Sequence, residues 1–347
     1  MVMNTMASAD QILEQRGVFR TLDAFVVAAA FDRDGTSCAF AMGDGSVWRA
    51  PVGGEWERGE VHDGAVLSLA PASSSRGWIT GGDDGLFARI GADGAVNEIA
   101  RFGMRWVEQA ASFADGRAGL IACGVGKYVH MFDGAGKKLK TLEHPSSVTG
   151  LAFDARGKRI AASHYNGASL WFVASKTDNP RRVEWKGSHT GIALHPDGDV
   201  VVTAMQENAL HGWRLTDGQH MRMTGYPGKT RALGFTKNGK WLASSGADSI
   251  VLWPFFGGGP MGKPPTELAG GDGVLCTMVA CHPANEVVAA GFDDGLVLVA
   301  DIGSARILPV AAPGRGAVSS LAWSPDGTLL AFGTETGFAA VVDFTKR

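Results

Sequence analysis

Residues 318–327 read Val-Ser-Ser-Leu-Ala-Trp-Ser-Pro-Asp-Gly, and residues 148–157 repeat the pattern as Val-Thr-Gly-Leu-Ala-Phe-Asp-Ala-Arg-Gly. In both stretches an apolar segment ends in an aromatic residue and then enters a turn that closes on glycine. Alternation of side chains at period two indicates a half-buried strand, and glycine marks a tight turn. A second strand of small residues, a second turn and a third strand follow. The repeating unit is therefore a run of short strands joined by tight turns.

This unit occurs eight times along the 347 residues, and its second turns lie about 40 to 46 residues apart. The second turns are Asp44-Gly45, Asp84-Gly85, Gly126-Lys127, Asn166-Gly167, Glu207-Asn208, Asp248-Ser249, Asp294-Gly295 and Thr336-Gly337. With a further polar strand before the next unit, that period is typical of blades of four antiparallel strands. We predict an all-β, closed β-propeller of eight four-stranded blades. Seven blades with one unit rearranged is the alternative.

The two ends of the chain predict how the ring closes. After the last third strand, at residues 338–343, four residues remain, so the last blade lacks its outer strand. An extended segment at residues 18–22 precedes the first inner strand and has no blade of its own. We expect this segment to complete the last blade, which removes exposed sheet edges. The predicted domains are an N-terminal extension, 1–17, with a short helical piece within 7–15, and a single propeller, 18–347.

The repeats resemble those of the WD-repeat family of β-propellers, over residues 18 to 344. The resemblance implies a hydrogen-bonded tetrad of His, Ser or Thr, Asp and Trp in each blade. In unit four the matching residues are His144, Ser163, Asn166 and Trp171, and this unit comes closest to the family pattern. In other units the tetrad is incomplete. The compact chain, rich in Ala and Gly, is typical of stand-alone bacterial propellers.

The resemblance also implies a binding face. In the family, the loops that join an outer strand to the next inner strand share the top face with the second-turn loops, around the channel entrance. The aromatic and cationic residues expected there are Phe25, Arg105, Trp106, Tyr165, Lys186, Lys229, Arg231 and Arg315. Aromatic and arginine side chains are enriched at interface hot spots. Trp185 and Tyr226 stand nearby, either exposed or packed between blades in place of the tetrad His. We therefore expect a protein or peptide partner.

Composition bounds the other classes of partner. The chain has 32 basic and 35 acidic residues, a net charge of −3, which argues against nucleic acid. No apolar run approaches the roughly 18 residues of a membrane span, and the first residues lack a secretory signal pattern. Four cysteines, none in a C-x-x-C pair, predict buried free thiols. We expect a cytoplasmic protein and, by default, a monomer.

Motifs for catalysis or metal binding are absent from the sequence. There is no G-x-S-x-G or S-x-x-K motif, and no carboxylate pair apart from turn positions. Cys276, Cys281 and His282 form a local cluster, but period two directs residues 276 and 281 to opposite faces of a strand. The glycine-rich stretch 257–264 lacks the Ser or Thr of a phosphate loop. We expect a non-catalytic interaction platform without a cofactor. The alternative is a propeller that binds a small ligand or metal at the channel mouth, with catalysis or metal handling as its role.

Overall fold

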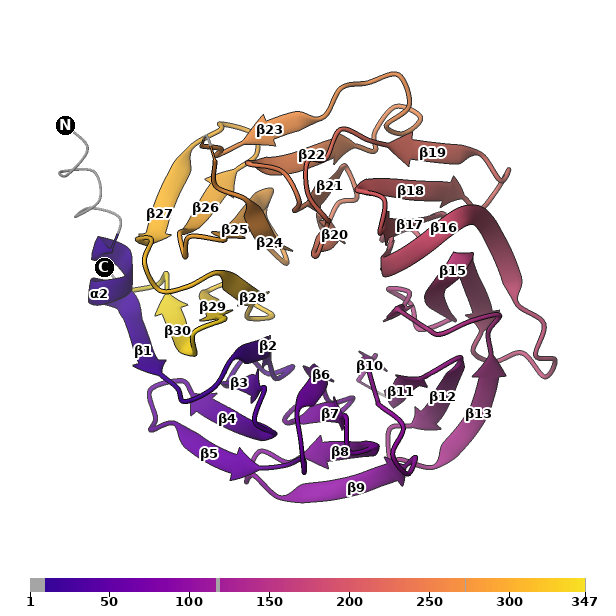
Figure 1. The fold of residues 1–347 in the computed structure, drawn as a ribbon, viewed down its shortest axis with the longest axis horizontal. Helices are drawn as coiled ribbons and strands as arrows, with labels where there is room; N and C mark the ends of the chain where they lie inside the picture. The colour runs from indigo at the N-terminus through magenta and orange to yellow at the C-terminus, as the bar shows by residue number, and fades with distance from the viewer. Residues whose placement is uncertain (1–9, 117–118, 272, 347) are drawn as a thin grey trace.

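The computed structural model describes residues 10–116, 119–271 and 273–346, and its strands form a ring (Figure 1). Unit one contains β2 (Val26–Phe31), β3 (Ser37–Met42), β4 (Ser46–Pro51) and β5 (Glu57–Glu60). Unit two contains β6 (Val66–Pro71), β7 (Trp78–Gly82), β8 (Leu86–Ile90) and β9 (Val96–Arg101). Unit three contains β10 (Gln109–Ala114), β11 (Gly119–Val125), β12 (Tyr128–Asp133) and β13 (Lys138–Glu143).

The second half of the ring continues the pattern. Units four and five are built from β14 (Gly150–Phe153), β15 (Arg159–Phe172), β16 (Arg181–Leu194), β17 (Val200–Met205), β18 (Ala209–Arg214) and β19 (His220–Met223). Unit six contains β20 (Leu233–Phe235), β21 (Trp241–Ser244), β22 (Ile250–Pro254) and β23 (Thr266–Leu268). Unit seven contains β24 (Cys276–Cys281), β25 (Val287–Phe292), β26 (Val297–Asp301) and β27 (Ile307–Ala311). Unit eight contains β28 (Val318–Trp323), β29 (Leu329–Thr334) and β30 (Phe338–Asp343).

The N-terminal strand closes the ring, as predicted. Strand β1 (Gly17–Thr21) pairs antiparallel with β30, from Gly17 opposite Val342 to Thr21 opposite Phe338. Unit eight therefore gains its fourth strand from the other end of the chain, and Figure 1 shows β1 and β30 side by side. The strand begins one residue earlier than the sequence pattern suggested.

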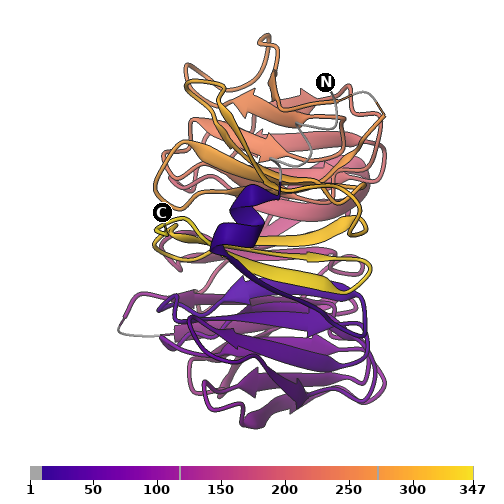
Figure 2. The same cartoon turned by 90° about the vertical axis from the view of Figure 1, so that its left-hand side faces the viewer.

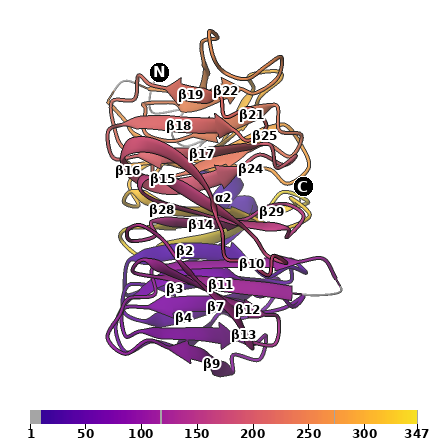
Figure 3. The ribbon, with the colours of Figure 1, turned by 90° about the vertical axis from the view of Figure 1, so that its right-hand side faces the viewer.

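The number of sheets differs from the main prediction. Six sheets have four strands each, and the remaining sheet, β14–β19, has six. The prediction of eight blades is wrong as a count of hydrogen-bonded sheets, and the alternative of seven is the count that the structure gives. The reason is β16, a single strand of 14 residues. Its first part, 181–188, pairs with β15, and its second part, 189–194, pairs with β17, so units four and five share one sheet (Figure 3).

The hydrophobic core lies between neighbouring sheets and not within any one of them. Between units one and two, for example, Ala39 and Ala41 of β3 pack against Trp78 and Ile90. Alternating residues of each strand face opposite sides of its sheet, so small residues on one sheet leave room for large ones on the next. The indole nitrogen of Trp78 also donates to the backbone oxygen of Ala30 at 2.9 Å, across the same boundary.

Hydroxyl groups near the start of several inner strands link each unit to the next one. Three such side chains donate to backbone oxygens of the following inner strand or of the segment just before it: Ser68 to Val107 at 3.1 Å, Thr277 to Val318 at 2.6 Å and Ser319 to Val26 at 2.6 Å. The last of these bonds joins unit eight to unit one. The ring is therefore closed at its inner wall as well as by β1 at its outer edge.

A short helix precedes the closing strand. Helix α2 (Gln11–Arg16) lies on the outer side of the ring and contacts β1, β27 and β30 (Figure 2). Leu13 is completely buried in the core between units seven and eight. Within the expected helical piece, 7–15, residues 7–9 lie outside the described residues. No helix of the described residues is long and apolar enough to cross a membrane.

The four cysteines are unpaired. Cys38, Cys123 and Cys276 are buried, as predicted, whereas Cys281 is partly exposed and its thiol contacts the backbone oxygen of Gly234 at 3.3 Å. Burial raises the pKa of the Cys276 and Cys281 thiols to about 12. Thiols with such pKa values are neutral and unreactive at physiological pH.

Candidate functional site

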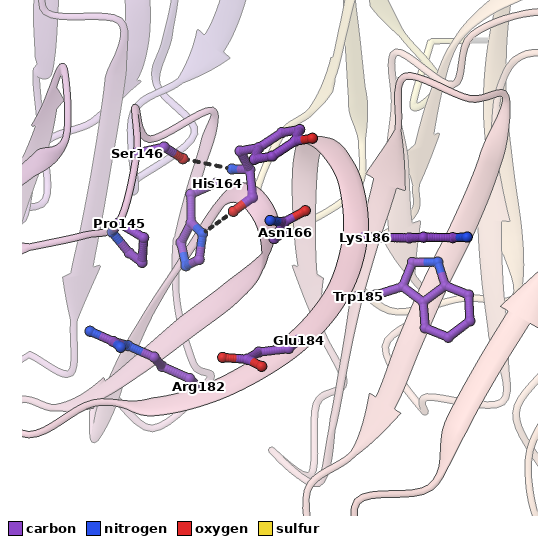
Figure 4. Close-up of a pocket in the computed structure, with 9 residues that line it drawn as sticks. Pro145, Ser146, His164, Asn166, Arg182, Glu184, Trp185 and Lys186 are labelled. Atoms are coloured by element: carbon purple, nitrogen blue, oxygen red, sulfur yellow. Dashed lines mark hydrogen bonds between the residues drawn. The ribbon is translucent and has the colours of Figure 1, made fainter.

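A groove lies where units four and five share their sheet, and its volume is 670 Å³ (Figure 4). Three chain segments line it: Pro145 and Ser146 before β14, His164, Tyr165 and Asn166 within β15, and Arg182, Glu184, Trp185 and Lys186 within β16. We call it the unit-four groove. Four of the residues singled out in the sequence lie in it, namely Tyr165, Asn166, Trp185 and Lys186.

A chain reversal inside β15 positions the first wall of the unit-four groove. Asn166 and Gly167 both have positive φ, 66° and 139°. His164 Nε2 lies 2.9 Å from Ser169 Oγ, although five residues along an extended strand would span roughly 16 Å. The chain therefore folds back at Asn166-Gly167, as the Asn-Gly turn signal indicates. Glycine is required here because a Cβ at residue 167 would lie 2.1 Å from the backbone oxygen of Val183.

Hydrogen bonds hold this turn in place. The backbone N–H of Tyr165 donates to Ser146 Oγ at 2.8 Å, as Figure 4 shows. The backbone N–H of Gly187 donates to Asn166 Oδ1 at 3.2 Å. Both sides of the turn are thus tied to the segments that face it, while the Tyr165 side chain remains 58% exposed. An exposed aromatic ring on a fixed backbone can contact a partner with little loss of entropy.

The histidine in the groove wall is neutral and already satisfied. His164 contacts the backbone oxygen of Tyr165 through Nδ1 at 2.9 Å and Ser169 Oγ through Nε2. Burial lowers its pKa. With both ring nitrogens engaged, His164 supports the turn and is not set up to accept a proton or a metal. Among the described residues, no three His, Cys, Asp or Glu side chains group as metal ligands would.

The opposite wall is fixed by unit five. The Trp185 ring stacks on His211 with centroids 4.2 Å apart and an angle of 18° between the planes. The backbone oxygen of Trp185 lies 2.9 Å from His189 Nε2. Trp185 therefore packs between units, one of the two options that the sequence left open. The continuous strand β16 and this stacked ring hold the opposite wall of the groove in place.

Three charged side chains occupy alternate positions of β16. Arg182, Glu184 and Lys186 are exposed, and in the described part of the chain none of them has an ion-pair partner. In Figure 4 the Arg182 and Glu184 side chains lie on the same side of the strand, facing His164. Alternate residues of a strand are roughly 7 Å apart. The groove thus presents a cation and an anion from alternate residues, whereas Lys186 extends away from them in Figure 4.

The other predicted binding residues lie in other units. Phe25, between β1 and β2, is 40% exposed, and Trp106, between β9 and β10, is 58% exposed beside the exposed Arg105. Lys229, between β19 and β20, is exposed. These side chains lie in separate loops between strands, and none of them lines the unit-four groove.

Two predicted cations are engaged by carboxylates of the same chain. Arg231 lies 3.4 Å from Glu335 in the turn before β30, across unit seven. Arg315 holds Asp10 through two hydrogen bonds of 3.0 and 2.8 Å, beside α2. An arginine with a carboxylate partner is a weaker docking group than a free one.

The predicted tetrad of unit four is joined only in part. Trp171 Nε1 donates to His144 Nε2 at 3.1 Å, but Ser163 Oγ contacts Thr149 Oγ1 and Asn166 contacts Gly187. Asn166 does not join the tetrad because its side-chain oxygen accepts a hydrogen bond from the backbone of Gly187 in β16. A more complete chain of contacts occurs in unit two, through a histidine that the sequence reasoning passed over. His62 lies 3.0 Å from both Asp84 Oδ1 and Thr80 Oγ1.

Sequence models of known families match two parts of the chain. The model described as the anaphase-promoting complex subunit 4 WD40 domain matches residues 279–347, and the model described as the WD domain, G-beta repeat, matches residues 136–171. The chain is a β-propeller, and its residues 136–171 and 279–347 are similar to WD repeats. Residues 136–171 include the first wall of the unit-four groove, so this part of the propeller carries the family signature.

Curated relatives of the propeller are larger proteins. The WD repeat-containing protein slp1 of Schizosaccharomyces pombe is 26% identical over 171 residues, which cover 46% of this chain and 35% of slp1. The pre-mRNA-processing factor 19 homolog 2 of Arabidopsis thaliana is 22% identical over 119 residues, or 32% of this chain and 22% of that protein. These matches thus span about a third or less of each relative.

A solved structure matches the whole ring. The crystal structure of the computationally designed Ika8 protein superposes with a TM-score of 0.73, over 93% of this chain and 98% of that one, at 18% sequence identity. At this identity the likeness describes the fold and carries no information on partners.

Proposed function

We propose that this propeller is a non-catalytic interaction platform and that the unit-four groove is its binding site for an extended segment of a partner protein. WD-repeat propellers generally mediate interactions between proteins. The observation that carries the proposal is the exposed Tyr165 ring on a fixed turn, beside side chains of β16 that have no ion-pair partner among the residues that the structure describes. Aromatic anchors flanked by charges are typical of interface hot spots.

The charge order of β16 suggests the chemistry of the partner. Arg182, Glu184 and Lys186 offer positive, negative and positive groups on alternate residues. A partner strand with acidic, basic and acidic residues at the same spacing would complement them. We also propose a cytoplasmic location, because unpaired thiols such as Cys38 and Cys281 are typical of reducing compartments.

The chemistry of the groove favours binding over turnover. His164 is neutral, with both nitrogens engaged. Asn166 and Ser146 already accept hydrogen bonds from the backbone. A small-ligand or catalytic site would instead bring together unengaged polar groups with pKa values poised near neutrality. In this groove the residue whose pKa is shifted is His164, and its role is to support the wall.

An affinity pull-down from native cell extract tests the proposal with two matched triple variants. The groove variant carries Tyr165→Ala, Arg182→Ala and Lys186→Ala. The control variant carries Leu308→Ala, Lys237→Ala and Arg306→Ala, which also removes one exposed apolar side chain and two exposed cations. We expect the intact protein and the control to retain the same partner and the groove variant to lose it. Equal retention by all three proteins would refute the groove as the binding site.

A further inference from the structure

The seam where β1 closes the ring lies across the ring from β15 and β16 (Figure 1). A second cavity is found at this seam. Its volume is 350 Å³, and its walls come from the segment before β1, the β4–β5 connection and the strands of unit eight. Because one water molecule occupies about 30 Å³ in the liquid, this space holds roughly ten to twelve non-hydrogen atoms. We call it the seam cavity.

The floor of the seam cavity is apolar. It includes the Trp56 indole, which is 7% exposed, together with Val341 of β30 and Leu329 of β29. Such a surface gains free energy when a hydrocarbon or aromatic group covers it, at about 25 cal/mol for each Å² removed from water. The floor alone would accept any small apolar molecule, so the charged groups at its rim decide the class of ligand.

One cation of the rim, Arg16, lacks an acceptor in the described part of the chain. Within residues 10–116, 119–271 and 273–346, no hydrogen bond or ion pair engages the Arg16 guanidinium, although its Nε atom is buried. A partly buried guanidinium without an acceptor is costly, because burial removes water that would otherwise solvate it. An anion in the cavity would supply the missing acceptor.

The two carboxylates of the rim, by contrast, already have donors. Glu55 Oε2 lies 2.6 Å from the guanidinium of Arg20. Asp343 Oδ1 accepts from the backbone N–H of Thr345 at 2.8 Å and from its hydroxyl at 2.6 Å. The rim therefore lacks an anionic acceptor for Arg16, and the floor favours an apolar group.

We propose that the seam cavity binds a small amphipathic carboxylate, with its hydrocarbon body on Trp56 and Val341 and its carboxylate on Arg16. The walls come from both ends of the chain, so the site is complete only when β1 has closed the ring. A ligand that binds only the closed ring stabilises it by mass action. The cavity would thus couple occupancy by such a carboxylate to the stability of the closure.

Isothermal titration calorimetry with sodium octanoate tests this site, with 1-octanol as the uncharged match. Octanoate has about ten non-hydrogen atoms and fits the volume. We expect octanoate to bind the intact protein and to raise its melting temperature. We expect Arg16→Gln to weaken octanoate at least tenfold, since a charge-assisted hydrogen bond is lost, and to leave 1-octanol unchanged.

Two further variants separate the site from general effects. Arg306→Gln removes an exposed arginine of unit seven that does not line the cavity, so octanoate affinity should stay within twofold of the intact value. Val18→Trp places a large ring at the exposed edge of the cavity and should block both ligands. No binding to the intact protein would overturn the proposal. Equal octanoate affinity in the intact protein, Arg16→Gln and Val18→Trp would overturn it as well.

Discussion

The indole nitrogen of Trp253 donates a hydrogen bond of 2.6 Å to the hydroxyl oxygen of Tyr226. The same hydroxyl lies 2.6 Å from Ser244 Oγ, and all three residues are buried. Tyr226 thus occupies, in unit six, the place that the WD-repeat pattern gives to histidine. Strands β21 and β22 and the connection before β20 are joined through one phenolic oxygen.

Replacing Tyr226 by phenylalanine should destabilise the propeller by about 2 kcal/mol, because the Trp253 N–H and the Ser244 hydroxyl both lose a buried partner. Urea unfolding at neutral pH measures the change. Tyr226→His restores a ring nitrogen that can accept from Trp253 and should recover part of the loss. If Tyr226→Phe is as stable as the intact protein, the phenolic oxygen does not hold the unit together.

Stability should fall as the pH drops below about 6.5. Burial lowers the pKa of His144 to about 4, and the neighbouring His164 contributes in the same direction. In the unfolded chain the pKa is about 6.5, so between these values the unfolded chain binds more protons than the folded one. His144 alone should account for a loss of about 2 kcal/mol between pH 7.5 and pH 5. Above pH 7 its contribution is constant.

The variant His144→Gln isolates that contribution. Glutamine can still accept a hydrogen bond from Trp171 Nε1 but does not titrate in this range. Urea unfolding at the two pH values should show a smaller loss in the variant than in the intact protein. The remaining loss is expected from other buried histidines, such as His130, whose pKa burial lowers to about 4. Identical losses in both proteins would contradict the assignment.

The turn inside β15 should not tolerate a side chain at residue 167. Gly167→Ala combines a φ of 139° with a Cβ at 2.1 Å from the Val183 oxygen, so we expect a loss of at least about 2 kcal/mol. Gly258→Ala is the matched control, because its φ is also positive, 96°, but nothing lies within 4 Å of the added Cβ. That variant should lose only about 1 kcal/mol. Thermal unfolding of the two variants gives the comparison.

The segment before β1 should contribute to folding. Leu13→Ala removes a completely buried side chain that packs in the core between units seven and eight, and we expect a cost of about 3 kcal/mol. Gln11→Ala, on the exposed side of the same helix, should change stability by less than about 0.5 kcal/mol. Equal effects of the two substitutions on the urea midpoint would show that α2 does not pack on the ring in solution.

The strand pattern and the closure of the ring could be predicted from turn chemistry. Glycine turns mark each hairpin, and the missing fourth strand of unit eight pointed to β1. The shared sheet could not be predicted, because residues 181–194 contain Gly187 and a polar stretch that are typical of a loop. In the structure they form one strand, because β15 pairs with the first part and β17 with the second.

The groove could be predicted only in part for the same reason. Tyr165 and Lys186 were identified as members of the binding face, but with 186 assigned to a loop, Arg182 and Glu184 had no reason to be considered. The alternation of charge at 182, 184 and 186 is the signal that a strand assignment would have revealed. The ion pairs of Arg231 and Arg315 join residues more than 100 positions apart, and no local pattern specifies such contacts.

The central claim is that a partner binds in the unit-four groove, and site-specific photo-cross-linking tests it most directly. A benzophenone amino acid is placed at position 165 in one protein and at position 308, on the exposed surface of β27, in another, and both are irradiated in native extract. We predict one cross-linked protein at 165 that excess unmodified propeller displaces, and no such product at 308. Absence of a displaceable product at 165, or the same product at both positions, would contradict the account.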